Sequence, residues 1–152
     1  MHIRPMTAAD LMAVVALWQT TKRAAYPYLP LEQSYSFDDN LHFFRDHIFV
    51  SCDIWLAEQE QQLLGFLAMR GSYIDRLYIL PSAQQQGIGT ALIAHAKLLS
   101  PTGLELHTHQ ENHSACAFYE KHGFQAVRFG TSPAPESAPD VEYHWRPATM
   151  DE

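Results

Sequence analysis

The chain has 152 residues, 47% of them hydrophobic and 18% charged, which is an ordinary globular composition and the length of about one domain. Its formal net charge of −7 argues against a nucleic-acid-binding protein, because phosphate contacts need clustered Lys and Arg, and it favours cationic or neutral substrates. No apolar run approaches the ~20 residues of a membrane span, and the first residues lack the apolar core of a signal peptide, so we expect a cytoplasmic protein with no nucleic-acid and no membrane partner.

Two helices are predicted in the first third of the chain. Residues 7–10 have the composition of a helix start, and the apolar residues that follow recur at helical spacing. Prolines within residues 26–30 end this helix, because proline cannot continue the helical hydrogen bonding. A second start follows at residues 36–39. Each helix is therefore expected to pack an apolar face on another element.

Strands are predicted next, followed by alternating helices and strands. Residues 54–58 and 63–69 are strand-like and are separated by polar residues, which predicts a hairpin with a third antiparallel strand at 74–80. The later elements are expected to be a helix from about residue 88 to 99, a strand at 104–109, a helix capped by Asn112 or Ser114 and ended by Gly123, and strands at 124–129 and 141–145 joined by a proline-rich loop. This order predicts one α/β domain with a mixed sheet over residues 1–152.

The segment Gln84-Gln85-Gln86-Gly87-Ile88-Gly89-Thr90 lies between a predicted strand and a predicted helix. A turn at a helix N-terminus presents unpaired main-chain N–H groups and a positive dipole end, which together favour an anion such as a diphosphate. Gly87 and Gly89 permit positive φ and a close approach of the backbone to a ligand. By position alone, an ordinary strand-to-helix turn remains the alternative.

Two linked segments carry a resemblance to a known family. The first is Leu77-Tyr78-Ile79-Leu80-Pro81 followed by Gln84-x-x-Gly87-x-Gly89, and the second is Asn112-x-x-Ala115-x-x-Phe118-Tyr119-Glu120-Lys121-x-Gly123-Phe124. Together they resemble the GNAT superfamily of acetyl-CoA-dependent N-acetyltransferases. The resemblance implies an α/β fold with a mixed, mostly antiparallel twisted sheet of about six to seven strands flanked by about four helices. In this fold the strand ending near Leu80 and the strand from Leu104 splay apart and hold acetyl-CoA.

The resemblance also implies how acetyl-CoA is bound. The main chains of Leu77 and Ile79 would bond the pantetheine arm as an extra strand does, residues 85–90 would hold the diphosphate, and the Asn112 amide would contact the pantetheine. Relatives often place Arg or Lys in the diphosphate loop, where this chain has glutamines, so binding is expected to depend on main-chain N–H groups, the helix dipole and Lys121. The expected cofactor-binding residues are Leu77, Tyr78, Ile79, Gln84, Gln85, Gln86, Gly87, Ile88, Gly89, Thr90, Asn112, Ala115, Tyr119 and Lys121.

Acetyl transfer needs a donor for the developing oxyanion and a proton for the departing thiolate. The resemblance places Tyr119 near the sulfur, so Tyr119 is the expected catalytic acid. The oxyanion is expected to meet a main-chain N–H near Leu77 or Tyr78, where a bulge in the strand can free a donor.

The family's usual general base is missing, because many relatives carry glutamate where this chain has Tyr73. Strand side chains alternate with period two, so Asp75 shares the face of Tyr73 and is the expected catalytic replacement, provided that no bulge intervenes. His107 and His109 are the alternatives, since imidazoles titrate near neutral pH.

The expected reaction is direct attack, in a ternary complex, by a primary amine of an unidentified small molecule or peptide. The residues expected to bind this acceptor are Tyr26, Tyr28, Tyr73 and His107. No metal ion is expected, because alternating strand histidines are more often solvated or hydrogen-bonded than metal-bound.

Two other functions are also compatible with parts of the sequence. A dinucleotide-binding oxidoreductase would share Gly87-x-Gly89, but the third small residue of that fingerprint is replaced by Leu92. A catalytically weak CoA-binding sensor or interaction module would keep the same fold. A homodimer is also considered, formed by pairing of the strand at 141–145 across an exposed sheet edge.

Overall fold

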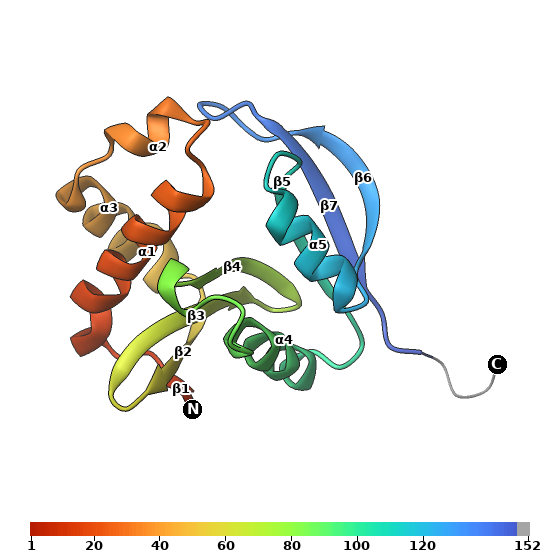
Figure 1. The fold of residues 1–152 in the computed structure, drawn as a ribbon, viewed down its shortest axis with the longest axis horizontal. Helices are drawn as coiled ribbons and strands as arrows, with labels where there is room; N and C mark the ends of the chain where they lie inside the picture. Colours follow the sequence, from red (N-terminus) through yellow and green to blue (C-terminus); the bar gives the residue numbers. More distant parts are fainter. Residues whose placement is uncertain (149–152) are drawn as a thin grey trace.

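The computed structural model describes residues 1–148 as a seven-stranded sheet with helices on both faces (Figure 1). The strands are β1 (His2–Pro5), β2 (Asp53–Gln59), β3 (Gln62–Arg70), β4 (Tyr73–Ile79), β5 (Leu104–His109), β6 (Gln125–Thr131) and β7 (Pro139–Trp145). The helices are α1 (Leu11–Ala25), α2 (Pro30–Ser34), α3 (Phe37–Phe43), α4 (Ile88–Leu99) and α5 (His113–Lys121), with short helical segments η1 (Ala8–Asp10), η2 (Phe44–Phe49) and η3 (Pro81–Ala83). Within residues 1–148, no helix is long and apolar enough to cross a membrane.

Local side-chain chemistry fixes several helix ends. Ser36 accepts a hydrogen bond from the Asp39 N–H at 3.0 Å, and the Asp39 carboxylate accepts from the Ser36 N–H at 2.9 Å, which caps α3. Asn112 caps α5 by accepting from the Ala115 N–H at 3.3 Å. Gly123 ends α5 with φ of 90°, a conformation that favours glycine. These ends are the ones that the sequence predicts.

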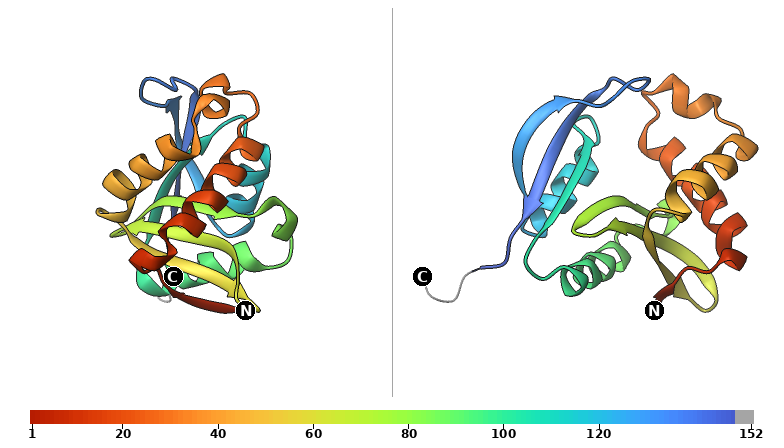
Figure 2. Two further views of the ribbon diagram at one scale, coloured as in Figure 1. Left: turned by 90° about the vertical axis from the view of Figure 1, so that its left-hand side faces the viewer. Right: turned by 180° about the vertical axis from the view of Figure 1, so that it is seen from behind.

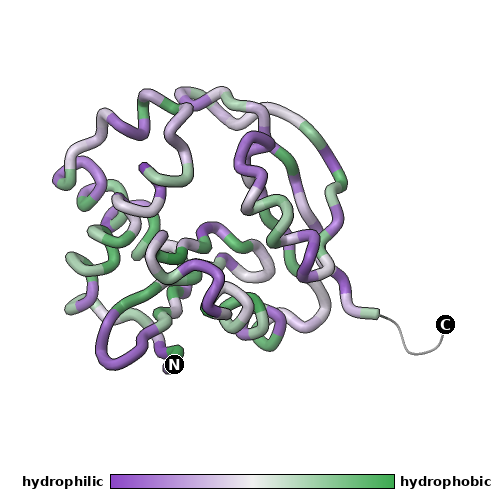
Figure 3. Tube along the Cα trace, viewed as in Figure 1, coloured by the Kyte–Doolittle hydropathy of each residue, from purple (hydrophilic) through white to green (hydrophobic). Residues whose placement is uncertain are grey.

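Alternate side chains of β3 belong to two separate cores, one on each face of the sheet. Phe66 and Ala68 pack with the buried residues of α1, whereas Leu67 and Met69 pack with those of α4. Figure 2 shows α1 and α4 on different sides of the strands, and Figure 3 shows hydrophobic segments along α4 and the central strands. The two cores therefore hold β4 in a fixed position between α1 and α4.

The sheet divides at the pair β4 and β5, which sets the place of the site. The strand order is β1-β2-β3-β4-β5-β7-β6, and all neighbours are antiparallel except β4 and β5. These parallel strands pair only at Tyr73 with Glu105 and Ile74 with Leu106. The ladder between β3 and β4 contains a bulge at Asp75, since Ala68 pairs with Arg76 and Met69 with Ile74. A bulge bends its strand, so β4 leaves β5 directly after the last paired residue.

The structure confirms the predicted fold class, the hairpin, the third antiparallel strand and the splayed strand pair. It adds β1 and α2, which the sequence did not predict, and it shortens the proline-rich loop to residues 132–138 because β6 and β7 extend into it. The expectation that residues 141–145 form an exposed edge is wrong, because β7 is bonded to β5 on one side and to β6 on the other. The edge strand on this side of the sheet is β6, and β1 is the edge strand on the other side.

Candidate active site

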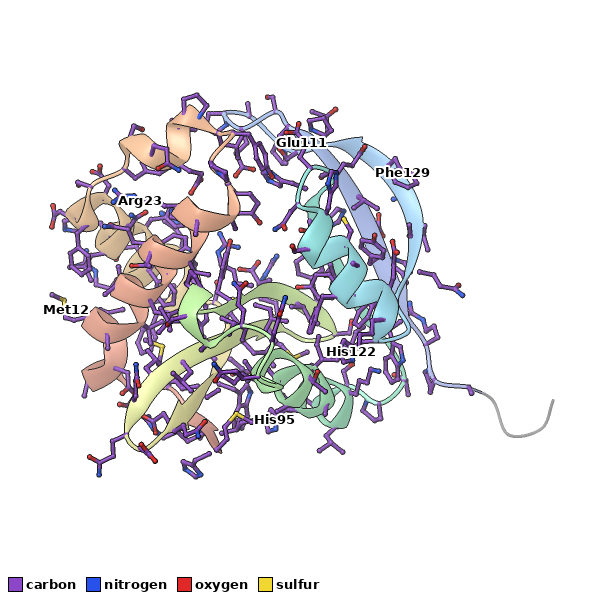
Figure 4. The ribbon with its side chains drawn as sticks, in the orientation of Figure 1. Met12, Arg23, His95, Glu111, His122 and Phe129 are labelled. Atoms are coloured by element: carbon purple, nitrogen blue, oxygen red, sulfur yellow. The ribbon has the colours of Figure 1, made fainter. Side chains whose placement is uncertain are left out.

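A cleft of about 970 Å³ opens between β4 and β5 where the two strands separate. It is bounded by the end of α1, the turn before α4, and α5, and Figure 4 shows side chains entering the space between these elements. The lining residues are Thr21, Ala24, Ala25, Tyr26, Ile74, Asp75, Arg76, Leu77, Tyr78, Ile79, Pro81, Gln84, Gln85, Gly87, Gly89, Thr90, Leu106, His107, Thr108, Asn112, Ser114, Ala115, Ala117, Phe118, Tyr119 and Lys121.

The turn at residues 84–90 presents unused main-chain donors to the cleft. Within the described part of the chain, none of the N–H groups of residues 85–90 donates a hydrogen bond to a protein acceptor. Gln85 has φ of 65° and Gly87 has φ of 84°, so the turn uses the left-handed region twice before α4 begins. The unused N–H groups stand at the positive end of α4, and this arrangement fits a diphosphate.

Gly89 permits the close contact between α4 and α5 that forms this end of the cleft. A Cβ atom at Gly89 would stand 3.0 Å from the Phe118 ring on α5. At the C-terminal end of α5, His122 lies beside α4 (Figure 4), and its Nε2 is 3.3 Å from the Thr90 hydroxyl. Lys121 is the neighbouring lining residue, so its charge stands near the predicted diphosphate site.

The main chain of β4 supplies a second set of unused groups. The Leu80 N–H donates to the Leu64 carbonyl of β3, so by strand alternation Tyr78 also faces β3, while Leu77 and Ile79 face the gap toward β5. Leu77 and Ile79 are thus available as predicted, although the Ile79 carbonyl already accepts from the Gln84 side chain at 3.1 Å. The Tyr78 N–H is not available as an oxyanion donor.

Tyr119 is held rigidly with its hydroxyl free. Its ring packs at 5.5 Å from that of Phe124 and 6.2 Å from that of Tyr143, and the side chain lines the cleft. Within residues 1–148 its hydroxyl forms no hydrogen bond to a protein group. Burial raises the pKa of this hydroxyl above its ordinary value, so it remains protonated at neutral pH and can act as a donor.

Asp75 lines the cleft, but both of its oxygens are occupied. Oδ1 accepts from Arg70 at 3.1 Å and Oδ2 accepts from Arg76 at 2.9 Å. The prediction of Asp75 as the base required a strand without a bulge. The structure has a bulge at Asp75 itself. A carboxylate bound by two guanidinium groups has no free oxygen directed at an amine, so the geometry does not favour Asp75 as the base.

His107 of β5 also lines the cleft and connects three strands. Its Nδ1 is 2.9 Å from the Tyr73 hydroxyl of β4, and its Nε2 is 3.6 Å from Oε1 of Glu142 on β7. Glu142 is further bound by His144 at 2.6 Å and Arg128 at 2.9 Å. The imidazole therefore has a hydroxyl on one side and a carboxylate on the other, which suits a group that takes up a proton.

The end of the cleft next to the C-terminus of α1 is closed by contacts between the segment that follows α1 and strand β5. The rings of Tyr26 and His109 are 4.6 Å apart, and the Tyr28 hydroxyl is 3.3 Å from Nδ1 of His109. His109 also approaches Glu136 at 3.5 Å, and burial raises the pKa of the Tyr26 hydroxyl. Tyr26 lines the cleft, whereas Tyr28 does not line it and contacts His109.

Most residues expected at the site meet in this one cleft. The expected residues that do not line it are Gln86, Ile88, Tyr28 and Tyr73. Ile88 is a buried residue of α4 itself, Gln86 donates from its side chain to the Ser82 carbonyl, and Tyr73 contacts the lining residue His107. The lining residues that the sequence did not single out include Thr21, Ala24, Ala25, Arg76 and Thr108, which come from α1, β4 and β5.

The chain is similar to known acetyltransferases. The acetyltransferase (GNAT) domain family matches residues 50–126. The peptidyl-lysine N-acetyltransferase YiaC of Escherichia coli is 29% identical over 126 residues, covering 82% of this chain and 84% of that protein. The peptidyl-lysine N-acetyltransferase YjaB of Salmonella typhimurium is 30% identical over 115 residues, covering 75% and 76%. The solution structure of apo YjaB from Escherichia coli superposes with a TM-score of 0.81 at 24% identity, covering 97% and 98%, and so shares the fold.

Proposed function

The chain belongs to the GNAT acetyltransferase family, and on this premise we propose that it transfers the acetyl group of acetyl-CoA to the side-chain amine of a lysine in a peptide or protein. Its fold and family make it an acetyl-CoA-dependent N-acetyltransferase. The lysine acceptor is supported by the relatives YiaC and YjaB, whose names describe peptidyl-lysine acetylation. We further propose that residues 1–152 form a single catalytic domain.

One observation carries the proposal: the turn whose N–H groups are unused at residues 85–90 lines the same cleft, through Gln85, Gly87, Gly89 and Thr90, as the unbonded hydroxyl of Tyr119. The N–H groups would bind the diphosphate, and the gap-facing main chain of Leu77 and Ile79 would bind the pantetheine arm as a strand partner. Acetyl-CoA, when bound, supplies the acetyl group and a thiolate leaving group. Tyr119 would then be placed to donate a proton to the departing sulfur.

We assign the proton acceptor to His107 rather than to Asp75. His107, which lines the cleft, would accept a proton from the ammonium group of the acceptor, with its ring oriented by the Tyr73 hydroxyl, and Glu142 would stabilise the resulting imidazolium from 3.6 Å. The neutral amine then attacks: as the N–C bond forms and the C–S bond breaks, Tyr119 loses its proton to sulfur, and the second proton that the nitrogen must lose passes to the Tyr119 phenolate. The Leu77 N–H, which faces the gap, is the proposed oxyanion donor.

His107→Gln is expected to lower kcat about tenfold at pH 7, because the ammonium group of the acceptor then loses its proton only to solvent. The deficit should shrink as the pH rises toward the pKa of the amine, since more acceptor is already neutral. Asp75→Asn should lose much less activity at every pH. Steady-state rates from pH 6 to 10 test both variants. A larger, pH-dependent loss in Asp75→Asn would return the base to Asp75.

The acceptor is tested with a panel of amines and a thiol-detecting assay. We expect turnover with lysine-containing peptides whose N-termini are blocked, and little turnover with polyamines or free amino acids. Acetylation of a small amine in preference to every lysine peptide would replace the proposed acceptor. CoA binding measured by calorimetry, without turnover of any amine, would favour a CoA-binding sensor of the same fold.

A further inference from the structure

Arg76 carries a guanidinium group in the cleft that the protein uses only in part. Its Nη1 donates to the Asp75 carboxylate at 2.9 Å and to the Asp75 carbonyl at 3.1 Å. Within residues 1–148, its Nε and Nη2 donate to no protein acceptor, and they are not among the buried polar atoms that lack a partner. The side chain is 26% exposed and lines the cleft, so a ligand in the cleft can reach it.

The position of Arg76 assigns this charge to the acceptor end of the cleft. Its guanidinium carbon is 5.8 Å from the Trp18 ring centroid on α1, whereas the diphosphate turn leads into α4, which belongs to the core on the other face of the sheet. Lys121, the other Lys or Arg residue of the cleft lining, precedes His122, which contacts Thr90 in that turn. The two cationic side chains therefore serve different ends of the same cleft.

The one carboxylate that contacts Arg76 does not cancel its charge, and Glu136, which also interacts with Arg76 electrostatically, is paired with His109. Arg70 and Arg76 share the single carboxylate of Asp75, which leaves the three groups with a net charge of +1. Lys22, the nearest cation on α1, is buried and is neutralised by Glu32 at 3.4 Å. An uncompensated cation beside the site of an amine disfavours the ammonium form of an acceptor that carries no anion of its own.

We propose that Arg76 binds a carboxylate of the acceptor, so that the preferred acceptor lysine stands beside an Asp or Glu residue. This inference rests on the proposed lysine acetyltransferase function and adds sequence selectivity to it. The free Nε and Nη2 donors form the planar fork that matches both oxygens of a carboxylate. An acidic neighbour of the lysine also offsets the positive charge at the acceptor end.

The test uses two blocked peptides that differ at one position, with Glu or Gln next to a single lysine. Wild-type protein is expected to show kcat/KM about tenfold higher for the Glu peptide, in the range of one charge-assisted hydrogen bond. Arg76→Gln should lower the rate with the Glu peptide to that with the Gln peptide. Arg70→Gln is the matched control, because it removes an equal charge and an equal contact with Asp75 from a side chain outside the cleft lining.

Retention of the Glu preference by Arg70→Gln and its loss in Arg76→Gln would support the inference. Equal rates with both peptides in the wild type would overturn it while leaving lysine acetylation intact. An equal loss with both peptides in Arg76→Gln would also overturn it, since Arg76 would then act on the amine and not on its neighbour. Failure of the wild type to acetylate either peptide would instead refute the proposed function, and this inference with it.

Discussion

Replacing Tyr119 by phenylalanine is expected to lower kcat by about 10²- to 10³-fold, the range observed for loss of a positioned general acid. The cleft contains the Tyr119 hydroxyl without any protein partner, so the substitution removes a donor and leaves the aromatic packing in place. The affinity for CoA should change little, because the main-chain donors of residues 85–90 are untouched.

The pH dependence follows from the direction of the pKa shift. Burial raises the pKa of the Tyr119 hydroxyl above its ordinary value, so the protonated form that donates persists to higher pH than it does in an exposed tyrosine. The wild-type rate should therefore show no decline at pH 9 to 10 from ionisation of this group.

Tyr143→Phe is the matched control for the tyrosine substitution. It also removes a buried hydroxyl that packs near Tyr119, but Tyr143 donates to Glu120 at 2.6 Å and does not line the cleft. Steady-state kinetics of both variants, with CoA affinity from calorimetry, separate the roles. Unchanged turnover in Tyr119→Phe, or equal losses in the two variants, would remove Tyr119 from the acid role.

That most of the proposed cofactor-binding residues line one cleft could be predicted from the sequence because their signals are local. The glycines of the turn, the Asn112 cap and Tyr119 on α5 lie within about 40 consecutive residues, and short-range capping and turn rules apply to each of them. The same reason explains why the helix ends were predicted well. The short strand β1 has no such signal, because its pairing with β2 joins residues that are distant in the chain.

The acceptor half depends on contacts between distant segments, which the sequence pattern does not specify. The bulge at Asp75 arises from the register between β3 and β4, and it determines that Arg76 meets Asp75. His107 meets Glu142 only because β7 inserts between β5 and β6. The prediction of Asp75 as the base follows from strand alternation, and non-local pairing is the reason that we propose His107 in its place.

Gly87→Val is expected to weaken CoA binding about 10²-fold, which corresponds to the loss of two charge-assisted hydrogen bonds. Gly87 has φ of 84° with no atom within 4 Å of an added Cβ, so valine meets backbone strain and not a steric clash. The cost of holding a β-branched residue in this conformation is about 1–3 kcal/mol. Relaxation to negative φ would turn the N–H groups of residues 88–90 away from the diphosphate.

Gly71→Val separates backbone strain from ligand binding. Gly71 has φ of 60° and also has no atom within 4 Å of an added Cβ, but it lies in the β3–β4 turn outside the cleft lining. Both variants should unfold at lower temperature than the wild type. The stabilisation by a ligand that binds only the folded state grows with the logarithm of the ratio of its concentration to its Kd. At one fixed CoA concentration, the melting temperature should therefore rise in Gly71→Val as in the wild type, and less in Gly87→Val. An equal CoA-induced rise in both variants would show that the diphosphate is held elsewhere than at the turn before α4.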